Sequence, residues 1–259
     1  MKLLVNHQTI YRYERMVNRS IQYLRMSPQT MAHQRVLNWQ LAVPGKTIIQ
    51  SDGFGNIWTT LSLDQPHQEL YLLAQGEIEI DDHAESIRDD RHPPELFLHS
   101  TQMTQSDEAM RDFTRLHLKS LDRSGLIAFA EAIAAKMPYT SGSTDVSTTA
   151  SEAFKLESGV CQDHTHVFLA CVRDHGVVAR YVSGYLYSSI SSHMASHAWA
   201  EVLLDGYWYC FDISNQLFTP TRHIQTAVGR DYLDAAPVRG VRQGGGKESL
   251  SALVQVLVS

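Results

Sequence analysis

The stretch SGVCQDHTHVFLACVRDHG, residues 158–176, decides how the second half of this chain is read. From Val160 onward its apolar residues recur at helical spacing, and Gly176 is a typical residue for ending the helix. Gly159 frees the backbone just ahead of Cys161, so the predicted helix begins at or just after that cysteine. Runs typical of strands follow, so the order from Val160 is one helix and then strands.

Cys161 has surroundings that suit a reactive thiol better than a core residue. It is followed directly by the polar side chains of Gln162, Asp163 and His164. At a helix N-terminus a thiol lies at the positive end of the macrodipole, which can lower its pKa from about 8.5 to roughly 3.5–7.5. Unpaired N–H groups there could also hold an oxyanion. We therefore expect a nucleophile here, although most cysteines are simply small buried hydrophobic residues.

A predicted hairpin supplies partners for this thiol. The strands SHAWAEVLL and YWYCFDI flank the dipeptide DG at 205–206, which is the strongest short hairpin signal. A two-residue turn places Trp199 opposite Asp212, and His197 then shares their face as a diagonal neighbour, about 7–8 Å away between backbones. An imidazole and a carboxylate can close that gap to a hydrogen bond. A three-residue loop would instead put His197 and Asp212 on opposite faces.

Cys161, His197 and Asp212 are the residue types that a thiol-based acyl-transfer site requires, because a thiol needs a base and the base needs an orienting group. Cys161 would attack an acyl carbon. His197 would take the thiol proton, or hold the thiolate as an ion pair, and then protonate the leaving amine. Asp212 would fix the imidazole tautomer. The alternative is structural: a strand histidine bonded to backbone, and an aspartate that caps a strand end. The chain has 13 histidines, so their number alone identifies no base.

A metal site is the competing interpretation of the same stretch. Its ligands would be Cys161, Asp163, His164 and His166. On a helix, however, residues 161, 164 and 165 share a face while 163 and 166 point elsewhere, and no second cysteine pair completes a set typical of zinc. No stretch has the spacing of an acidic calcium loop either. We therefore expect no metal ion and no cofactor.

The rest of the chain divides into three parts. Residues 1–82 contain short alternating runs of β-branched and aromatic residues between turn signals, which predicts a small antiparallel β-domain. Residues 83–95 are charged, include two prolines, and indicate a linker. Residues 96–259 open with helical patterns, the first with Ser106 as its expected N-cap, and end in a strand. We expect this last part to form the catalytic domain.

Composition bounds the class of protein. The 259 residues are 43% hydrophobic and 19% charged, which is typical of a globular protein of one large or two small domains. The formal charge of −6 and the lack of a basic run argue against a nucleic-acid partner. No apolar run is long enough for a membrane span, and the start lacks a signal-peptide core. Three cysteines form no disulfide framework, so we expect a cytoplasmic protein.

The blocks GVCQDHTHVFLACVRDHGVVARYVSGYLY and SHAWAEVLLDGYWYCFDISN resemble the core of the transglutaminase-like superfamily. The resemblance is strongest to its bacterial branch, whose members are described as cysteine proteases. In that family the cysteine of GVCQD, the histidine of HAWAEV and the aspartate after the W…FD strand form the catalytic triad. The resemblance therefore implies these roles for Cys161, His197 and Asp212.

The resemblance extends to the N-terminal β-region and to residues 139–154 and 223–241, so it covers nearly the whole chain. The motif FDISN departs from the DPTN common in relatives at Ile213 and Ser214, which concerns the loop beyond Asp212. By the same resemblance, residues 229–240 form a structured loop near the active site.

The resemblance implies an α+β fold, in which a small antiparallel β-domain precedes a papain-like, transglutaminase-like core. It implies acyl transfer on an amide through a thioester, with water as the favoured acceptor, as in a peptidase or amidase. The alternatives are γ-glutamyl transfer to an amine and a non-catalytic peptide-binding module. The expected partner is a peptide or protein substrate, and the oligomeric state stays open. Candidates for the substrate cleft are Gln162, Asp163, His164, Trp199, Tyr139, Tyr185 and Tyr232. For Asp163 and His164 the alternative is that they anchor the start of the helix.

Overall fold

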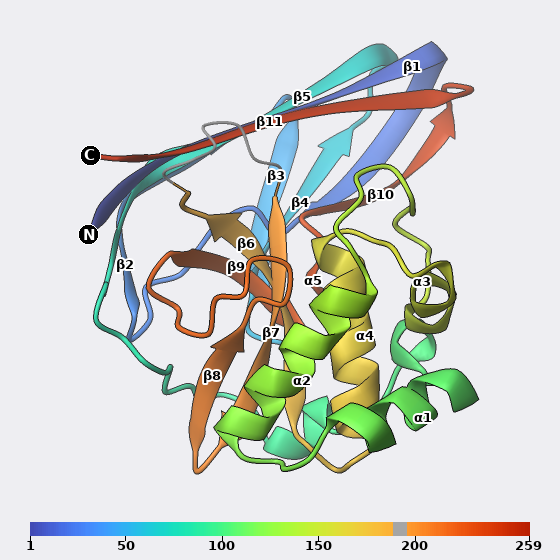
Figure 1. The fold of residues 1–259 in the computed structure, drawn as a ribbon. Coiled ribbons are helices and arrows are strands. Elements are labelled where there is room, and N and C mark those ends of the chain that lie inside the picture. The colour runs from blue at the N-terminus through green and yellow to red at the C-terminus, as the bar shows by residue number, and fades with distance from the viewer. Residues whose placement is uncertain (189–195) are drawn as a thin grey trace.

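A computed structural model describes residues 1–188 and 196–259 as two antiparallel sheets and a group of helices (Figure 1). The strands of the first sheet are β1 (Lys2–Leu24), β2 (Gln34–Ala42), β3 (Lys46–Ser51), β4 (Ile57–Leu63), β5 (His67–Ile80), β10 (Val238–Gly244) and β11 (Glu248–Val258). Those of the second sheet are β6 (Ala179–Leu186), β7 (His197–Leu204), β8 (Tyr207–Phe211) and β9 (His223–Gly229). The α-helices are α1 (Glu108–His117), α2 (Arg123–Lys136), α3 (Ala150–Leu156), α4 (Cys161–Arg173) and α5 (Tyr232–Ala235), and the short 3₁₀ helices are η1 (Pro94–Phe97) and η2 (Gln102–Thr104).

The long strand β1 organises the first sheet. Its N-terminal part lies between β5 and β11, and its C-terminal part lies between β4 and β10. The register with β5 shifts between Arg12 and Val17, where the strand changes partners. Alternate side chains of β1 are buried, as the period of two in a strand requires. The antiparallel β-region predicted from the sequence is confirmed, and the two termini lie side by side (Figure 1).

The C-terminal strands differ from the predicted division, which assigned residues 96–259 to the catalytic domain. β11 pairs along β1 from Leu3 opposite Val258 to Tyr13 opposite Glu248, and β10 continues the pairing. Val254 and Val256 are buried with the apolar side chains of β1, so this tail completes the first sheet. Sequence order could not reveal this, because strand partners are set by long-range pairing rather than by position in the chain.

The segment expected as a linker, residues 83–95, is attached to the second sheet. Ile87 exchanges backbone hydrogen bonds with Trp208 of β8. The Asp89 carboxylate accepts a hydrogen bond of 2.7 Å from the buried Arg180 guanidinium, which also pairs with Glu201 of β7 at 2.7 Å. These charges are buried but mutually paired, which limits their desolvation cost. The segment therefore fixes the edge of the second sheet instead of linking two bodies loosely.

The second sheet has the strand order β8–β7–β6–β9 and confirms the predicted hairpin. Asp205 and Gly206 form its two-residue turn with φ values of 50° and 83°, which a type I′ turn requires. Leu204 faces Tyr207, and the pairing runs without a shift to Ala200 and Phe211. The next position along puts Asp212 where its side chain can meet that of His197.

Helix α4 is the centre of the main core. Nearly every residue after Cys161 is buried, because β6 and β7 cover one side of the helix and α2 and α3 cover another (Figure 1). Phe168 of α4 stacks on Phe211 of β8 with ring centroids 5.2 Å apart. A Phe-to-Ala truncation at such a position costs about 3–5 kcal/mol, so the packing locks the helix onto the sheet. The expected α+β architecture is confirmed.

The first helix begins one residue later than predicted. The cap is Asp107, whose side chain accepts from the backbone N–H of Met110 at 2.9 Å. Ser106 instead bonds the carboxylate of Asp174 at the end of α4. Within residues 1–188 and 196–259, no helix is both long and apolar enough to cross a membrane.

Candidate active site

Cys161 is the first residue of α4, and Asp163 fixes this helix start. The Asp163 carboxylate accepts hydrogen bonds from the backbone N–H of Val160 at 2.8 Å and from the Thr144 hydroxyl at 2.6 Å. A Cβ on Gly159 would lie 2.6 Å from that of Asp163, so only glycine fits the approach to the helix. Burial raises the pKa of Asp163, and its two hydrogen bonds oppose the rise. We conclude that Asp163 positions Cys161 through the backbone.

Cys161 differs from the other two cysteines in its exposure. Cys171 and Cys210 are buried, whereas Cys161 is partly exposed, and all three are free thiols. Burial raises the pKa of Cys171 to about 12 and also raises that of Cys210. Thiolates are the reactive form of cysteine, so these two thiols are inert at neutral pH. Of the three cysteines, Cys161 is the one that a substrate can reach.

His197 and Asp212 meet as the hairpin register predicted. His197 Nε2 donates to Asp212 Oδ2 at 2.8 Å, and both side chains are buried. The backbone N–H of Asn215 and its Nδ2 each donate to Asp212 Oδ1 at 3.2 Å. With Nε2 occupied by Asp212, the ring nitrogen left for Cys161 is Nδ1.

The electrostatics of this pair favour its charged form. Burial acts to lower the pKa of His197, but the Asp212 charge and hydrogen bond outweigh it and, with the adjacent Cys161 side chain, raise the pKa to about 10. The His197 charge and the hydrogen bonds from both neighbouring histidines overcome burial and hold the pKa of Asp212 well below its usual range. These interactions therefore favour an imidazolium beside a carboxylate, with the Cys161 side chain next to the ring.

His223 is a site residue that the sequence did not indicate. It lies on β9 and is fully buried, and its Nε2 is 3.0 Å from the same Asp212 oxygen that His197 contacts. Its ring also packs on Trp199, with centroids 4.8 Å apart. No local signal could have distinguished it among 13 histidines, because residues 223–229 show no hairpin partner in the sequence.

His197, Asp212 and His223 are also the described residues best placed to hold a metal ion, because their ligand atoms lie within 4.8 Å of one another. Both histidine nitrogens, however, contact one carboxylate oxygen at hydrogen-bond distance. Asn215 Nδ2 donates to both oxygens of that carboxylate, at 3.2 Å to Oδ1 and 3.0 Å to Oδ2. Hydrogen bonding therefore accounts for the cluster.

Two of the predicted cleft residues on α4 have anchoring contacts. His164 is buried, with Nε2 2.8 Å from the carbonyl oxygen of Met137 and Nδ1 2.7 Å from the Ser214 hydroxyl. Its Nε2 must donate to the carbonyl, so Nδ1 accepts from the hydroxyl, and burial lowers the pKa of the ring. Gln162 is also buried and donates to the carbonyl of Val146 at 3.2 Å. Ser214 and Val146 thus belong to loops that α4 holds in place.

Two of the aromatic candidates, Tyr139 and Trp199, lie near the candidate catalytic residues. Tyr139 is 58% exposed, and its backbone pairs with that of Gly159, two residues before Cys161. Burial of part of its ring, together with the charges of Cys161, Asp163 and Asp212, raises the pKa of its hydroxyl. Trp199 is buried behind His197, with centroids 6.1 Å apart and nearly parallel rings.

Tyr185 does not lie at this site. It is buried between the two sheets, and its hydroxyl lies 3.0 Å from Nδ1 of His7 on β1. The expectation that it lines the cleft is therefore corrected: the apolar faces of the two sheets meet at this point of β6, and the tyrosine fills their interface.

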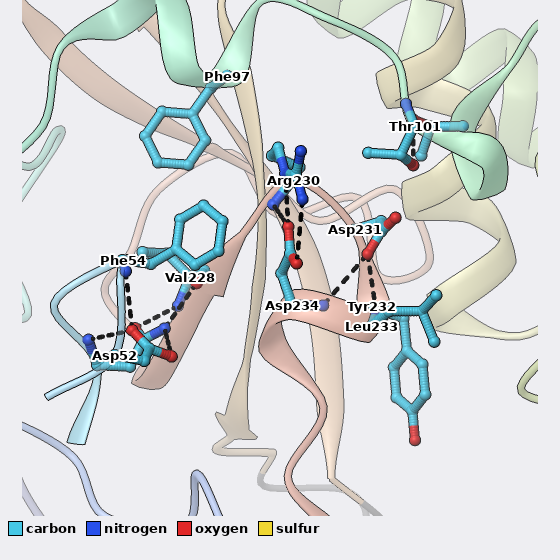
Figure 2. Close-up of polar contacts among 12 residues, drawn as sticks. Asp52, Phe54, Phe97, Thr101, Val228, Arg230, Asp231, Tyr232, Leu233 and Asp234 are labelled. Carbon is cyan, nitrogen blue, oxygen red and sulfur yellow. Dashed lines mark hydrogen bonds and ion pairs between the residues drawn. The ribbon is translucent and has the colours of Figure 1, made fainter. Parts of the chain in front are cut away.

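Tyr232 begins the one-turn helix α5, which follows β9 and is shown in detail in Figure 2. Asp231 accepts from the backbone N–H groups of Leu233 at 2.8 Å and Asp234 at 3.2 Å, and Arg230 pairs with Asp234 at 2.8 Å. The Tyr232 backbone N–H donates to Nε2 of the buried His166 on α4 at 3.1 Å. The turn is thus ordered and attached to the helix that carries Cys161.

Two family models match the chain. Residues 3–79 match the bacterial transglutaminase-like N-terminal region, and residues 111–213 match the transglutaminase-like superfamily. The second match includes Cys161, His197 and Asp212. Outside these ranges, the tail is tied to the first match by the β1–β11 pairing.

Proteins of similar sequence and fold cover almost the full chain. An uncharacterised protein of Mycobacterium leprae, ML0607, is 28% identical over 98% of both chains. The uncharacterised protein Rv2569c of Mycobacterium tuberculosis is 27% identical over 92% of this chain and 86% of its own. The crystal structure of a "Putative Cysteine Protease" from Cytophaga hutchinsonii has a TM-score of 0.81 at 21% identity, over 99% of this chain and 90% of that one. The chain therefore carries the bacterial transglutaminase-like N-terminal region, followed by a core of the transglutaminase-like superfamily.

Proposed function

We propose that this protein is a cysteine-dependent enzyme that transfers an acyl group from an amide through a thioester. The observation that carries the proposal is the 2.8 Å hydrogen bond between His197 and Asp212 beside Cys161 at the start of α4. A thiol, an imidazole and a buried carboxylate in this order constitute the activated nucleophile of such enzymes. The substrate is a peptide bond or a glutamine carboxamide.

The proposed reaction assigns each proton and bond. Cys161 Sγ, as the thiolate beside protonated His197, attacks the amide carbon, and the carbonyl electrons move to the oxygen. Backbone N–H groups at the start of α4 stabilise that oxyanion. His197 then gives its proton to the amide nitrogen as the C–N bond breaks, leaving a thioester and neutral imidazole. Water or an amine, deprotonated by His197, attacks the thioester, and the thiolate leaves. Asp212 holds the ring throughout.

We favour water as the acceptor, which makes the protein a peptidase or amidase. This preference rests on the fold neighbour that is described as a cysteine protease. An amine acceptor would make it a protein-glutamine γ-glutamyltransferase, and the same three residues serve both reactions. A non-catalytic peptide-binding module of this fold would need no activated thiol.

Labelling with iodoacetamide at about pH 6.5 tests the activated thiol, because an activated thiolate reacts at a pH where ordinary thiols are largely protonated. We expect Cys161 to react well ahead of Cys171 and Cys210 by mass spectrometry, and His197→Ala to abolish the difference. Cys161→Ala is the matched control for labelling elsewhere. Equally slow labelling of Cys161 in the native protein and in His197→Ala would refute the enzyme and favour the binding module.

A glutamine-containing peptide library, incubated with and without a primary amine, identifies the acceptor. Cleaved or deamidated peptides would support hydrolysis, and amine adducts would replace it with transfer. We further propose a cytoplasmic location and a peptide or protein as the partner. Support for the location comes from Cys161, Cys171 and Cys210, which are all free.

A further inference from the structure

Asp212 has more hydrogen-bond donors than a triad requires. Its Oδ1 accepts from the backbone and the side chain of Asn215, and its Oδ2 accepts from His197 and also from the Asn215 side chain at 3.0 Å. His223, from a different strand, adds a contact of 3.0 Å to Oδ2. Because a buried ionised carboxylate is an acceptor only, His223 must carry its proton on Nε2 to make this bond.

The second nitrogen of His223 has surroundings consistent with that tautomer. Its Nδ1 lies 3.9 Å from Sγ of Cys210, a weak donor that is itself fully buried. The ring packs at a tilt of 54° on Trp199, which also lies behind His197. Among the described residues near this ring, Asp212 is therefore the strong hydrogen-bond partner, and the packing leaves the ring little freedom to turn away from it.

The strand that carries His223 is itself held by the N-terminal sheet. β9 is the edge strand of the second sheet, so one side of its backbone has no strand partner among residues 1–188 and 196–259. The Gln34 side chain exchanges hydrogen bonds of 2.9 and 2.8 Å with the backbone of Gln225. The Asn56 side chain does the same with Val228, at 2.8 Å for both bonds. Figure 2 shows the loop of Asp52 and Phe54 lying against Val228.

These two amide side chains make hydrogen bonds to the edge of β9 as a neighbouring strand would. Both are buried, and they contact β9 on either side of its centre. The Asn56 amide is oriented by Asp52 Oδ2 at 3.1 Å, and Asp52 is held in turn by Arg25 at 2.7 Å. The position of β9, and with it that of the His223 ring, is therefore set by the N-terminal region as well as by β6.

We infer that His223 is a positioning residue, which fixes the Asp212 carboxylate in the plane and orientation that His197 needs, and that the N-terminal sheet holds it there through β9. The inference rests on the proposed function, because it assigns His223 a role in that same site. His223 touches no substrate. It acts on the thiol through Asp212 and His197.

Two variants of similar size separate hydrogen bonding from packing. In His223→Gln an amide N–H can occupy the place of Nε2–H, whereas His223→Met fills the space without a donor. A hydrogen bond to a charged group is worth enough to change a rate roughly ten- to hundredfold. We expect iodoacetamide to label Cys161 of His223→Met more slowly by that factor at neutral pH, and labelling of His223→Gln to stay within about threefold of the native rate. Circular dichroism verifies folding of both variants.

The outcomes distinguish this inference from the proposed function. If His197→Ala abolishes the rapid labelling while His223→Met does not, the enzyme stands and the role of His223 is refuted. If the native protein shows no rapid labelling, the proposed function itself fails. Equal losses in His223→Gln and His223→Met would show a packing role and overturn the inference.

A measurement on the unaltered protein covers the case in which both variants unfold. Nitrogen-15 NMR of histidine rings identifies which nitrogen carries the proton. We expect His223 to have a proton on Nε2, shifted downfield by its hydrogen bond to a carboxylate. A bare Nε2 on His223 would exclude donation to Asp212 and overturn the inference.

Discussion

Replacement of Asp212 by Asn gives the sharpest test of the site's electrostatics. The pKa of His197 is raised from 6.5 to about 10, mainly by the Asp212 charge and hydrogen bond acting against burial. That difference corresponds to on the order of 5 kcal/mol of preference for the protonated ring. Asn at this position retains a side chain of similar size but carries no charge. Burial then acts unopposed by the carboxylate, and the pKa of His197 should fall below 6.5.

The assay is an NMR titration of the histidine rings in isotope-labelled protein, with His197 assigned by its loss in His197→Gln. In the native protein we expect His197 to stay protonated from pH 6 to 9, and in Asp212→Asn to be neutral throughout that range. Asp112→Asn removes an exposed carboxylate on α1 and should leave the His197 titration unchanged. A native His197 that titrates at 6.5 or below would refute the proposed ion pair.

Three further predictions concern stability, each measured by urea denaturation. Because the pKa of His197 is higher in the folded state, its protonation should add stability that is complete below pH 6.5 and is lost as the pH rises towards 10. Asp212→Asn should lack this pH dependence of the free energy of unfolding. The same pH dependence in the variant and in the native protein would contradict the prediction. Asn56→Ala leaves backbone groups of Val228 unpaired and should cost about 2–4 kcal/mol; no loss would show that β9 needs no clamp. His164→Leu should cost about 2–3 kcal/mol yet leave labelling of Cys161 nearly unchanged, whereas slower labelling with intact stability would place His164 in the cleft.

The local part of the site could be predicted from short stretches of sequence. The turn at Asp205 and Gly206 fixes the hairpin register, because two residues of positive φ allow one turn geometry, and this places His197 on the face of Asp212. The position of Cys161 at a helix start also follows from its neighbours, since Gly159 and Asp163 form the cap within five residues. Each of these features depends on interactions that are close along the chain.

The shared architecture and family were also visible in the sequence, since the motifs around the three candidate catalytic residues are contiguous blocks. The sequence did not show which contacts individual side chains make. His164 looks the same in sequence whether it lines a cleft or bonds Met137 and Ser214. The strand pattern around Tyr185 would be the same whether this residue lined the cleft or lay between the sheets. Only the packing of one sheet on the other buries it against His7.

Only the tertiary structure decided the long-range pairings. The C-terminal strand β11 pairs with β1, which lies more than two hundred residues earlier in the chain. His223 contacts Asp212 because β9 pairs with β6 and is hydrogen-bonded by the side chains of Gln34 and Asn56. The sequence by itself determined the hairpin and the helix start, where a few neighbouring residues restrict the backbone to one conformation. Strand partners far apart in the chain have many nearly equivalent local choices, and the choice among them is made by the burial and hydrogen bonding of the whole molecule.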